Sequence, residues 1–175
     1  MALKIIQYSL HDIYPEIALN TIELLKENKT VCLFTMGKDK NVVLKILASV
    51  YMNIEVIRES VYMNIEVNKF LQNKLTDEEK QKVNKFEKLL NTKFKDNLYI
   101  FDNYRYSLEQ IDTILQTLND KNKTPFLVVI DDLIYIDFQG VIKDLYNQLN
   151  DLQNKFDVKL VVYENQHLLE MAKSL

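Results

Sequence analysis

A run of apolar residues that ends in two aspartates constrains the fold of this chain more than any other feature. After Pro125 the sequence reads Phe-Leu-Val-Val-Ile from 126 to 130, followed by Asp131 and Asp132. An uninterrupted apolar run of this length predicts a strand covered on both faces, which belongs in the middle of a sheet. Carboxylates that follow such a strand lie at the edge where open α/β sheets bind their ligands. Asp131 and Asp132 are therefore candidate ligands of Mg²⁺.

Strand and helix patterns alternate through the rest of the chain. Strand-forming apolar runs occupy five short ranges: 3–9, 30–35, 98–102, 126–130 and 159–163. Apolar residues at helical spacing fill the intervals, and two capping boxes mark helix starts, at Thr76 to Glu79 and at Ser107 to Gln110. This order predicts an α/β fold of three layers, with a mostly parallel five-stranded sheet and helices on both faces. We expect 1–175 to form a single domain.

An 11-residue unit is repeated in tandem at 49–59 and 60–70, and both copies begin with Ser-Val-Tyr-Met-Asn-Ile-Glu-Val. Eleven residues make about three helical turns, so an insertion of this length keeps the following helix face in phase. The repeat is predicted to lengthen the helical region after the second strand. One interpretation is a duplication without function, and the other is a helical arm that contacts a partner. The arm would use four side chains: Tyr51, Met52, Tyr62 and Met63.

Composition limits the class of protein. The single cysteine, Cys32, lies inside an apolar run, so the chain has no disulfide framework and fits a reducing compartment. No apolar stretch reaches the roughly 20 residues of a membrane span, and no signal-peptide pattern opens the chain. A cytoplasmic location and no membrane partner are therefore expected. The net charge of -3 gives no global reason to bind nucleic acid, so DNA is a candidate partner that charge does not support.

Several short segments match, in their order along the chain, the motifs of a known family. They are Lys45 to Ser49, Lys74 to Glu79, Leu98 to Asp102, Ser107-Leu108, Val128 to Leu133 and Val161 to Gln166. In this order they resemble the RecA-type ATPase domain of replicative DNA helicases of the DnaB family, over the run from Thr30 to Tyr163. The resemblance implies a RecA-like fold of the P-loop NTPase type, in which Val128 to Leu133 is the Walker B strand.

The phosphate-binding elements of that family are missing from the sequence. A P-loop needs a glycine-rich turn followed by Lys and Ser or Thr, whereas Ser9 to Glu16 contains no glycine, no lysine and two acids. Gly37 stands where the family carries a glutamate that activates water. The chain ends soon after Gln166, so the family's arginine finger is expected to be absent. We also expect the connection from Ser9 to Glu16 to be compact and capped by side chains.

The resemblance places the remaining candidate residues. Asp131 and Gln166 are vestigial nucleotide-binding positions, and Asp132 stands beside Asp131 as a vestigial Mg²⁺ ligand. The pair Gly37-Lys38 is a weaker candidate, since a glycine-lysine turn before a helix invites an anion. No residue pattern marks a catalytic group, because the sequence has no nucleophile elbow, no paired cysteines and no HExxH motif.

Two hypotheses about function follow. The favoured one is a catalytically inactive interaction or regulatory module linked to DNA replication, which pairs with itself or with an active replicative helicase through RecA-type docking faces and needs no cofactor. The alternative is an ATPase or DNA-handling helicase subunit that binds ATP and Mg²⁺ at an unorthodox site near Gly37-Lys38 and Asp131. The first strand, 3–9, is a test of the fold, since a RecA-like domain requires it inside the sheet.

Overall fold

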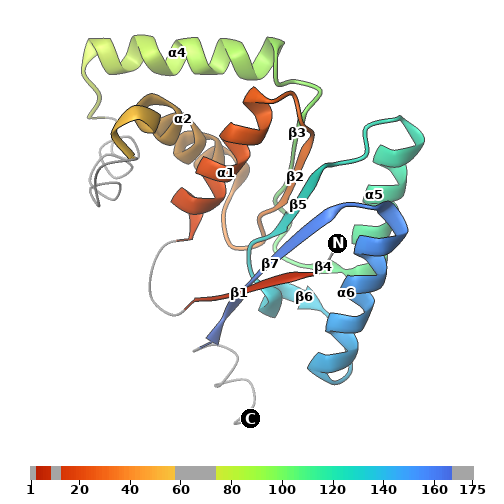
Figure 1. Cartoon of the computed structure of the whole chain (residues 1–175). Helices are drawn as coiled ribbons and strands as arrows, with labels where there is room; N and C mark the ends of the chain where they lie inside the picture. Colours follow the sequence, from red (N-terminus) through yellow and green to blue (C-terminus); the bar gives the residue numbers. More distant parts are fainter. Residues whose placement is uncertain (1–2, 9–12, 58–73, 167–175) are drawn as a thin grey trace.

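The structure is a computed structural model, and it describes residues 3–8, 13–57 and 74–166. Among these residues, five strands form one sheet (Figure 1). In spatial order they are β1 (Lys4–Tyr8), β7 (Lys159–Asn165), β5 (Leu127–Ile130), β2 (Val31–Phe34) and β3 (Leu98–Phe101). Every neighbouring pair is parallel, so the predicted five-stranded sheet is confirmed and is parallel throughout rather than mostly parallel.

The strand that precedes the two aspartates is the central strand of the sheet, as predicted. Every residue of β5 and of its neighbour β2 is buried, because both faces of these strands are covered. The first strand, β1, lies inside the sheet, as a RecA-like fold requires, and pairs with β7. It stands at one edge of the sheet, where its residues are only partly buried.

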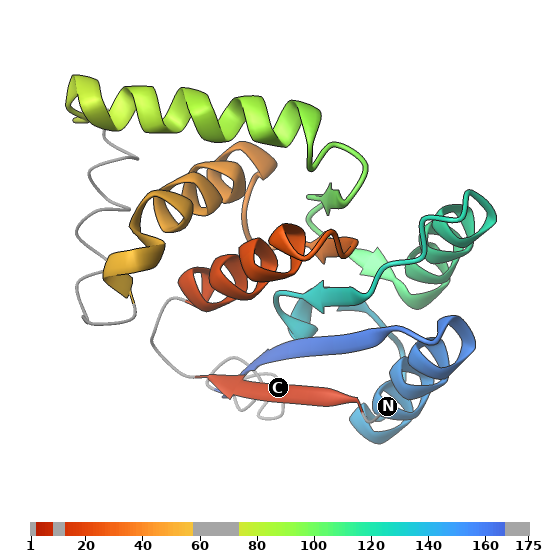
Figure 2. The ribbon, with the colours of Figure 1, turned by 45° about the horizontal axis from the view of Figure 1, so that its top comes forward.

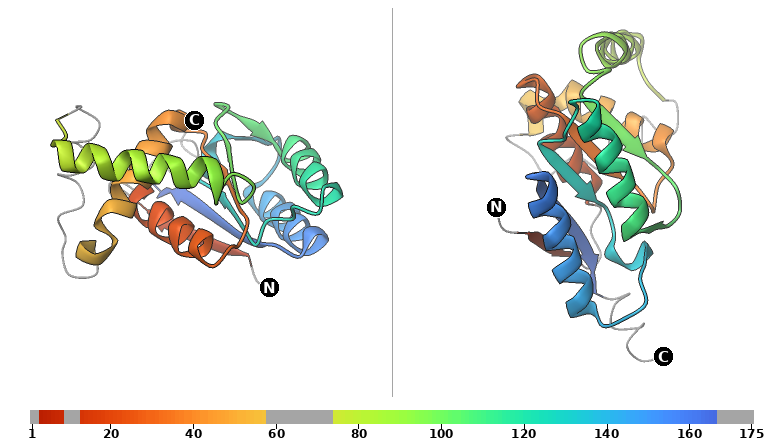
Figure 3. Two further views of the ribbon diagram at one scale, coloured as in Figure 1. Left: turned by 90° about the horizontal axis from the view of Figure 1, so that it is seen from above. Right: turned by 90° about the vertical axis from the view of Figure 1, so that its right-hand side faces the viewer.

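Helices cover both faces of the sheet, which confirms the three predicted layers (Figure 2). The helices of one face are α1 (Tyr14–Lys26) and α2 (Lys40–Ile57), and those of the other are α5 (Leu108–Asp120) and α6 (Ile142–Phe156). A further helix, α4 (Asp77–Thr92), packs on α2 (Figure 3). Within the described residues, no helix has the length and apolar character needed to cross a membrane.

Alternate strand residues supply two cores, one on each face of the sheet. Leu33 and Val129 pack into the core below α1 and α2, whereas Cys32 and Val128 pack into the core below α5 and α6. This alternation follows from the two-residue period of a strand, in which successive side chains point to opposite faces.

A second sheet of two short parallel strands was not predicted. After Asp132 the chain forms a 3₁₀ turn (Leu133–Tyr135) and then β6 (Ile136–Asp137), which pairs with β4 (Tyr106–Ser107). Two-residue strands carry no readable periodicity, and this explains why the sequence patterns missed them.

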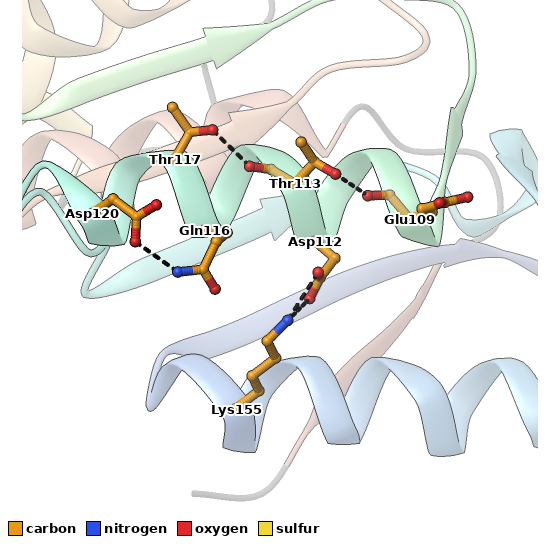
Figure 4. A network of polar contacts seen from close by, with 7 residues as sticks. All are labelled: Glu109, Asp112, Thr113, Gln116, Thr117, Asp120 and Lys155. Atoms are coloured by element: carbon orange, nitrogen blue, oxygen red, sulfur yellow. Dashed lines mark hydrogen bonds and ion pairs between the residues drawn. The ribbon is translucent and has the colours of Figure 1, made fainter.

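The capping box at Ser107 is confirmed. The backbone N–H of Gln110 donates to Ser107 Oγ at 3.2 Å, and the Ser107 N–H donates to Gln110 Oε1 at 2.9 Å. Farther along α5, the Lys155 ammonium of α6 donates to both carboxylate oxygens of Asp112, at 2.6 and 2.9 Å, and joins the two helices (Figure 4). The helix predicted to start after Thr76 begins at Asp77. The side-chain contacts predicted for its capping box lie outside the described residues.

The tandem repeat is described only in its first copy. Residues 49–57 form the last part of α2, and 58–70 lie outside the described residues. The ring of Tyr51 lies 4.8 Å from that of Phe86 on α4, so this side chain contacts its own chain. The side chains of Met52, Tyr62 and Met63 lie outside the described residues.

The start of α1 corrects one expectation. The N-cap residue is Ile13, and it makes no side-chain cap, so the prediction of a side-chain-capped connection is wrong at this position. Pro15 stands in the first turn, where its missing N–H removes one of the donors that a cap would otherwise satisfy. Residues 9–12 of the connection lie outside the described residues.

Candidate functional site

The candidate residues gather at the carboxyl edge of the sheet, where parallel strands all end. Asp131 and Asp132 follow β5, while Gly37 and Lys38 follow the neighbouring strand β2. Gln166 follows β7 on the other side of β5. The sheet order therefore brings the sequence-predicted residues to one edge.

Asp131 is almost fully buried, with 2% of its surface exposed, and its carboxylate is held by donors from two other segments. The Met36 N–H donates to Oδ1 at 2.9 Å, and the Gly37 N–H donates to Oδ2 at 3.1 Å. The hydroxyl of Tyr14, in the first turn of α1, donates to the same Oδ2. One carboxylate thus joins the central strand to the loop after β2 and to α1.

Asp132 is held in the same way, by a tyrosine and by backbone donors. The hydroxyl of Tyr8, the last residue of β1, donates to Oδ2 at 2.8 Å, and the Ile134 N–H donates to Oδ1 at 3.2 Å. Asp132 is 5% exposed. Its second contact caps the 3₁₀ turn that leads to β6.

A third buried carboxylate lies on the neighbouring strand β7. Glu164 accepts a hydrogen bond from the hydroxyl of Tyr146 on α6 and another from Gln7 Nε2 at 3.0 Å. Gln166, the predicted phosphate sensor, donates from Nε2 to Gln7 Oε1 at 2.7 Å. Gln166 is therefore linked to β1 and does not contact Asp131 by any hydrogen bond in the described residues.

Neutral donors hold all three buried carboxylates. Within the described residues, no ion pair involves Asp131, Asp132 or Glu164. Burial raises the pKa of Asp131 above its ordinary value, against the hydrogen bonds from Tyr14, Gly37 and Met36 that lower it. Burial likewise raises the pKa of Asp132. A buried acid without a cation gains protons more readily, because desolvation disfavours its charged form.

The pair Gly37-Lys38 is also engaged within the chain. The Gly37 N–H points to Asp131, and the Lys38 ammonium lies 4.6 Å from the centroid of the Tyr14 ring. A Cβ atom at Gly37 would stand 3.7 Å from Asp131 Oδ2, which is ordinary contact, so the backbone does not require glycine here. The two groups expected to receive an anion instead surround Tyr14 and Asp131.

Sequence reasoning missed the residues that complete this edge: Tyr8, Tyr14, Tyr146 and Gln7. A signal was present, since buried acids need donors and Tyr8 and Tyr14 flank a connection that supplies no cation. The resulting arrangement binds and orients carboxylates within the protein. Among the described residues, no cluster of three or more His, Cys, Asp or Glu side chains has the geometry to hold a metal ion.

Comparisons with known proteins identify the fold. No protein-family model matches the sequence, and no curated protein matches it. The structure is similar to the solved ATPase domain of a DnaB-like helicase, with a TM-score of 0.63 and 14% identity over 97% of this chain. It is also similar to a DnaB-like replicative helicase that was described with its interactions with primase, with a TM-score of 0.59 and 15% identity over 94% of this chain.

The similarity to DnaB-like helicase ATPase domains therefore extends over nearly the whole chain, at low sequence identity. It confirms the RecA-like fold expected from the sequence. The chain spans 59% of the solved ATPase domain and 38% of the replicative helicase described with primase.

Replacing Tyr14 tests whether its hydroxyl stabilises ionised Asp131. We expect Tyr14→Phe to lower the free energy of unfolding by about 1.5–3 kcal/mol at pH values where Asp131 is charged, the usual range for a hydrogen bond to a charged group. Loss of the hydroxyl also raises the Asp131 pKa further, so the deficit should shrink as pH falls and Asp131 becomes protonated. Urea unfolding at mildly acidic and mildly alkaline pH measures both values.

Tyr99→Phe is the matched control, because the Tyr99 hydroxyl donates to the backbone carbonyl of Asp96 at an exposed site. Its effect should be small and independent of pH. An equal, pH-independent loss in both variants would contradict the assigned role of Tyr14. The sign for the native protein follows from the raised pKa of Asp131: stability from this group is full below its ordinary pKa of about 3.9 and is lost as pH rises through the folded value.

Proposed function

We propose that this protein is a catalytically inactive relative of DnaB-like helicase ATPase domains and serves as a protein-interaction or regulatory module linked to DNA replication. The observation that carries the proposal is the set of contacts at the carboxyl edge of the sheet. Asp131, at the Walker B position of the resemblance, is buried and accepts hydrogen bonds from Tyr14, Met36 and Gly37. The first residue of α1 thus donates to the acid that would otherwise face a nucleotide.

The chemistry of phosphoryl transfer supports the proposal. Transfer needs backbone donors, a lysine and a metal ion that neutralise charge on the phosphates as it develops. The connection after β1 has no glycine or lysine, and the Gly37 N–H is used by Asp131. We therefore propose that the protein works without ATP or Mg²⁺, and that Asp131, Asp132 and Gln166 are retained as structural groups.

An exposed aromatic pair supports the proposed interaction role. Tyr104 is 65% exposed, and its ring lies 5.2 Å from that of Tyr135 and 5.7 Å from the guanidinium of Arg105. Tyr135 also borders Gly37, so this pair lies beside the carboxyl edge. Tyrosine and arginine are among the residue types most enriched where protein interfaces gain their energy. We propose that this surface meets a second copy of the chain or an active replicative helicase.

Nucleotide addition should leave stability unchanged. A ligand that binds only the folded state, at 100 times its dissociation constant, would add about 2.7 kcal/mol. We expect no shift of the thermal midpoint with ATP, ADP or GTP at millimolar concentration with Mg²⁺, and no phosphate release. An active DnaB-type ATPase domain, run in parallel, shows that the assay detects binding. A saturable midpoint increase that depends on Mg²⁺ would contradict the proposal and favour a nucleotide-binding subunit.

Association should depend on the exposed aromatic pair. Light scattering and a pull-down with the host's replicative helicase should detect a complex, and Tyr104→Ala should weaken it by about 2 kcal/mol, roughly 30-fold. Phe126→Ala is the matched control, since Phe126 is a 39% exposed aromatic residue before β5, at the other end of the strand. A strictly monomeric protein that captures no helicase would contradict the interaction role.

A further inference from the structure

A cleft of about 590 Å³ lies on the helical layer, between α2, α4 and the edge strand β3. Its walls include Leu44 and Ala48 of α2, Phe86 and Leu90 of α4, and Leu98 and Ile100 of β3. We call it the α2–α4 cleft. None of the residues at the carboxyl edge of the sheet lines it, so it is separate from the site described above.

The cleft exists because α4 packs on α2 instead of on the sheet. The contact of Phe86 with Tyr51, at 4.8 Å between ring centroids, helps to hold α4 against α2. β3 is the last strand of the sheet, and the helix that precedes it does not lie over its face (Figure 3). A space therefore remains between the two helices and Leu98.

The interior of the cleft is apolar and keeps hydrophobic surface exposed. Phe86, Phe94 and Ile100 form buried parts of its lining, and each belongs to the adjoining hydrophobic core. Leu44 and Leu90 are only half-buried, although they pack against the same core. A ligand that covers such side chains gains about 25 cal/mol for each Å² of apolar surface removed from water.

The rim of the cleft is cationic on a protein that is acidic as a whole. Lys40 and Lys45 of α2 and Lys95, after α4, line it together with one acid, Glu87. No ion pair among the described residues involves any of these three lysines. The local excess of positive charge contrasts with the net charge of -3 of the chain, so the cleft is complementary to an anionic group.

We propose that the α2–α4 cleft binds a small amphiphile with a carboxylate head and a linear hydrocarbon body. The volume lies within the roughly 300–1,000 Å³ of small-molecule sites, which combine apolar walls with a few charged groups that orient the ligand. The hydrocarbon body covers Leu44, Leu90 and Leu98, and the carboxylate meets Lys45 or Lys95. This site goes beyond the proposed interaction role and does not depend on it.

Calorimetric titration with decanoate, below its micelle concentration, tests the site. We expect one saturable site per chain. Decyltrimethylammonium has the same chain length and the opposite charge, and it should bind at least about tenfold more weakly, a difference of about 1.4 kcal/mol. Equal binding of the two amphiphiles would overturn the proposal, because it would show that the lysines select nothing. Failure of decanoate to bind would also overturn it.

Variants locate the binding. Lys45→Gln combined with Lys95→Gln should weaken decanoate binding about tenfold, whereas Lys121→Gln combined with Lys143→Gln, at exposed lysines outside the cleft, should leave it unchanged. Leu90→Gln is a second, independent variant that should also weaken it, with circular dichroism confirming the fold of each protein.

Undiminished binding in both cleft variants would place the amphiphile elsewhere and overturn the proposal. Light scattering on Leu90→Gln examines a different occupant. Loss of self-association in this variant, together with no decanoate binding to the native chain, would identify the cleft as a surface between two copies, which also contradicts the proposal.

Discussion

Burial of carboxylates at the end of the central strand is the constraint on which the rest of this structure depends. Asp131 and Asp132 follow β5, whose position in the middle of the sheet removes them from water. A buried acid is costly unless hydrogen bonds replace its lost solvent. Tyr14 and Tyr8 supply those bonds, and both flank the connection in which related ATPase folds place a phosphate loop. The same contacts that close this edge therefore also fix β1 and α1 against the sheet.

The fold persists although the chain has only two glycines. Helices commonly end with a residue in the left-handed conformation, a place that glycine usually fills. Here Asn28, Asn122 and Asp157 adopt positive φ angles of 58°, 54° and 51° at or just after the ends of α1, α5 and α6. Asn and Asp tolerate this conformation better than other residues that carry a side chain. The chain thus keeps its turns while it lacks the glycine cluster that a phosphate loop needs.

Local patterns predicted the parts of this molecule that depend on neighbouring residues. The apolar runs in β2 and β5, the capping box at Ser107 and the alternation of strands with helices all follow from short-range spacing, and the structure contains each of them. The carboxylate contacts could not be predicted in this way, because Tyr14 and Asp131 are 117 positions apart. Periodicity shows that an acid ends a buried strand, but only the three-dimensional arrangement shows which donor reaches it.

Carbon-13 NMR titration of the Asp131 side-chain carboxyl, with and without Mg²⁺ and ATP, tests most directly whether this edge is closed by the protein's own side chains. We expect the Asp131 pKa to lie above its ordinary value, since burial outweighs its three hydrogen bonds, and to stay the same when Mg²⁺ and ATP are added. A pKa at or below the ordinary value, or a saturable change of the carboxyl resonance with Mg²⁺ and ATP, would contradict a closed, structural role for Asp131.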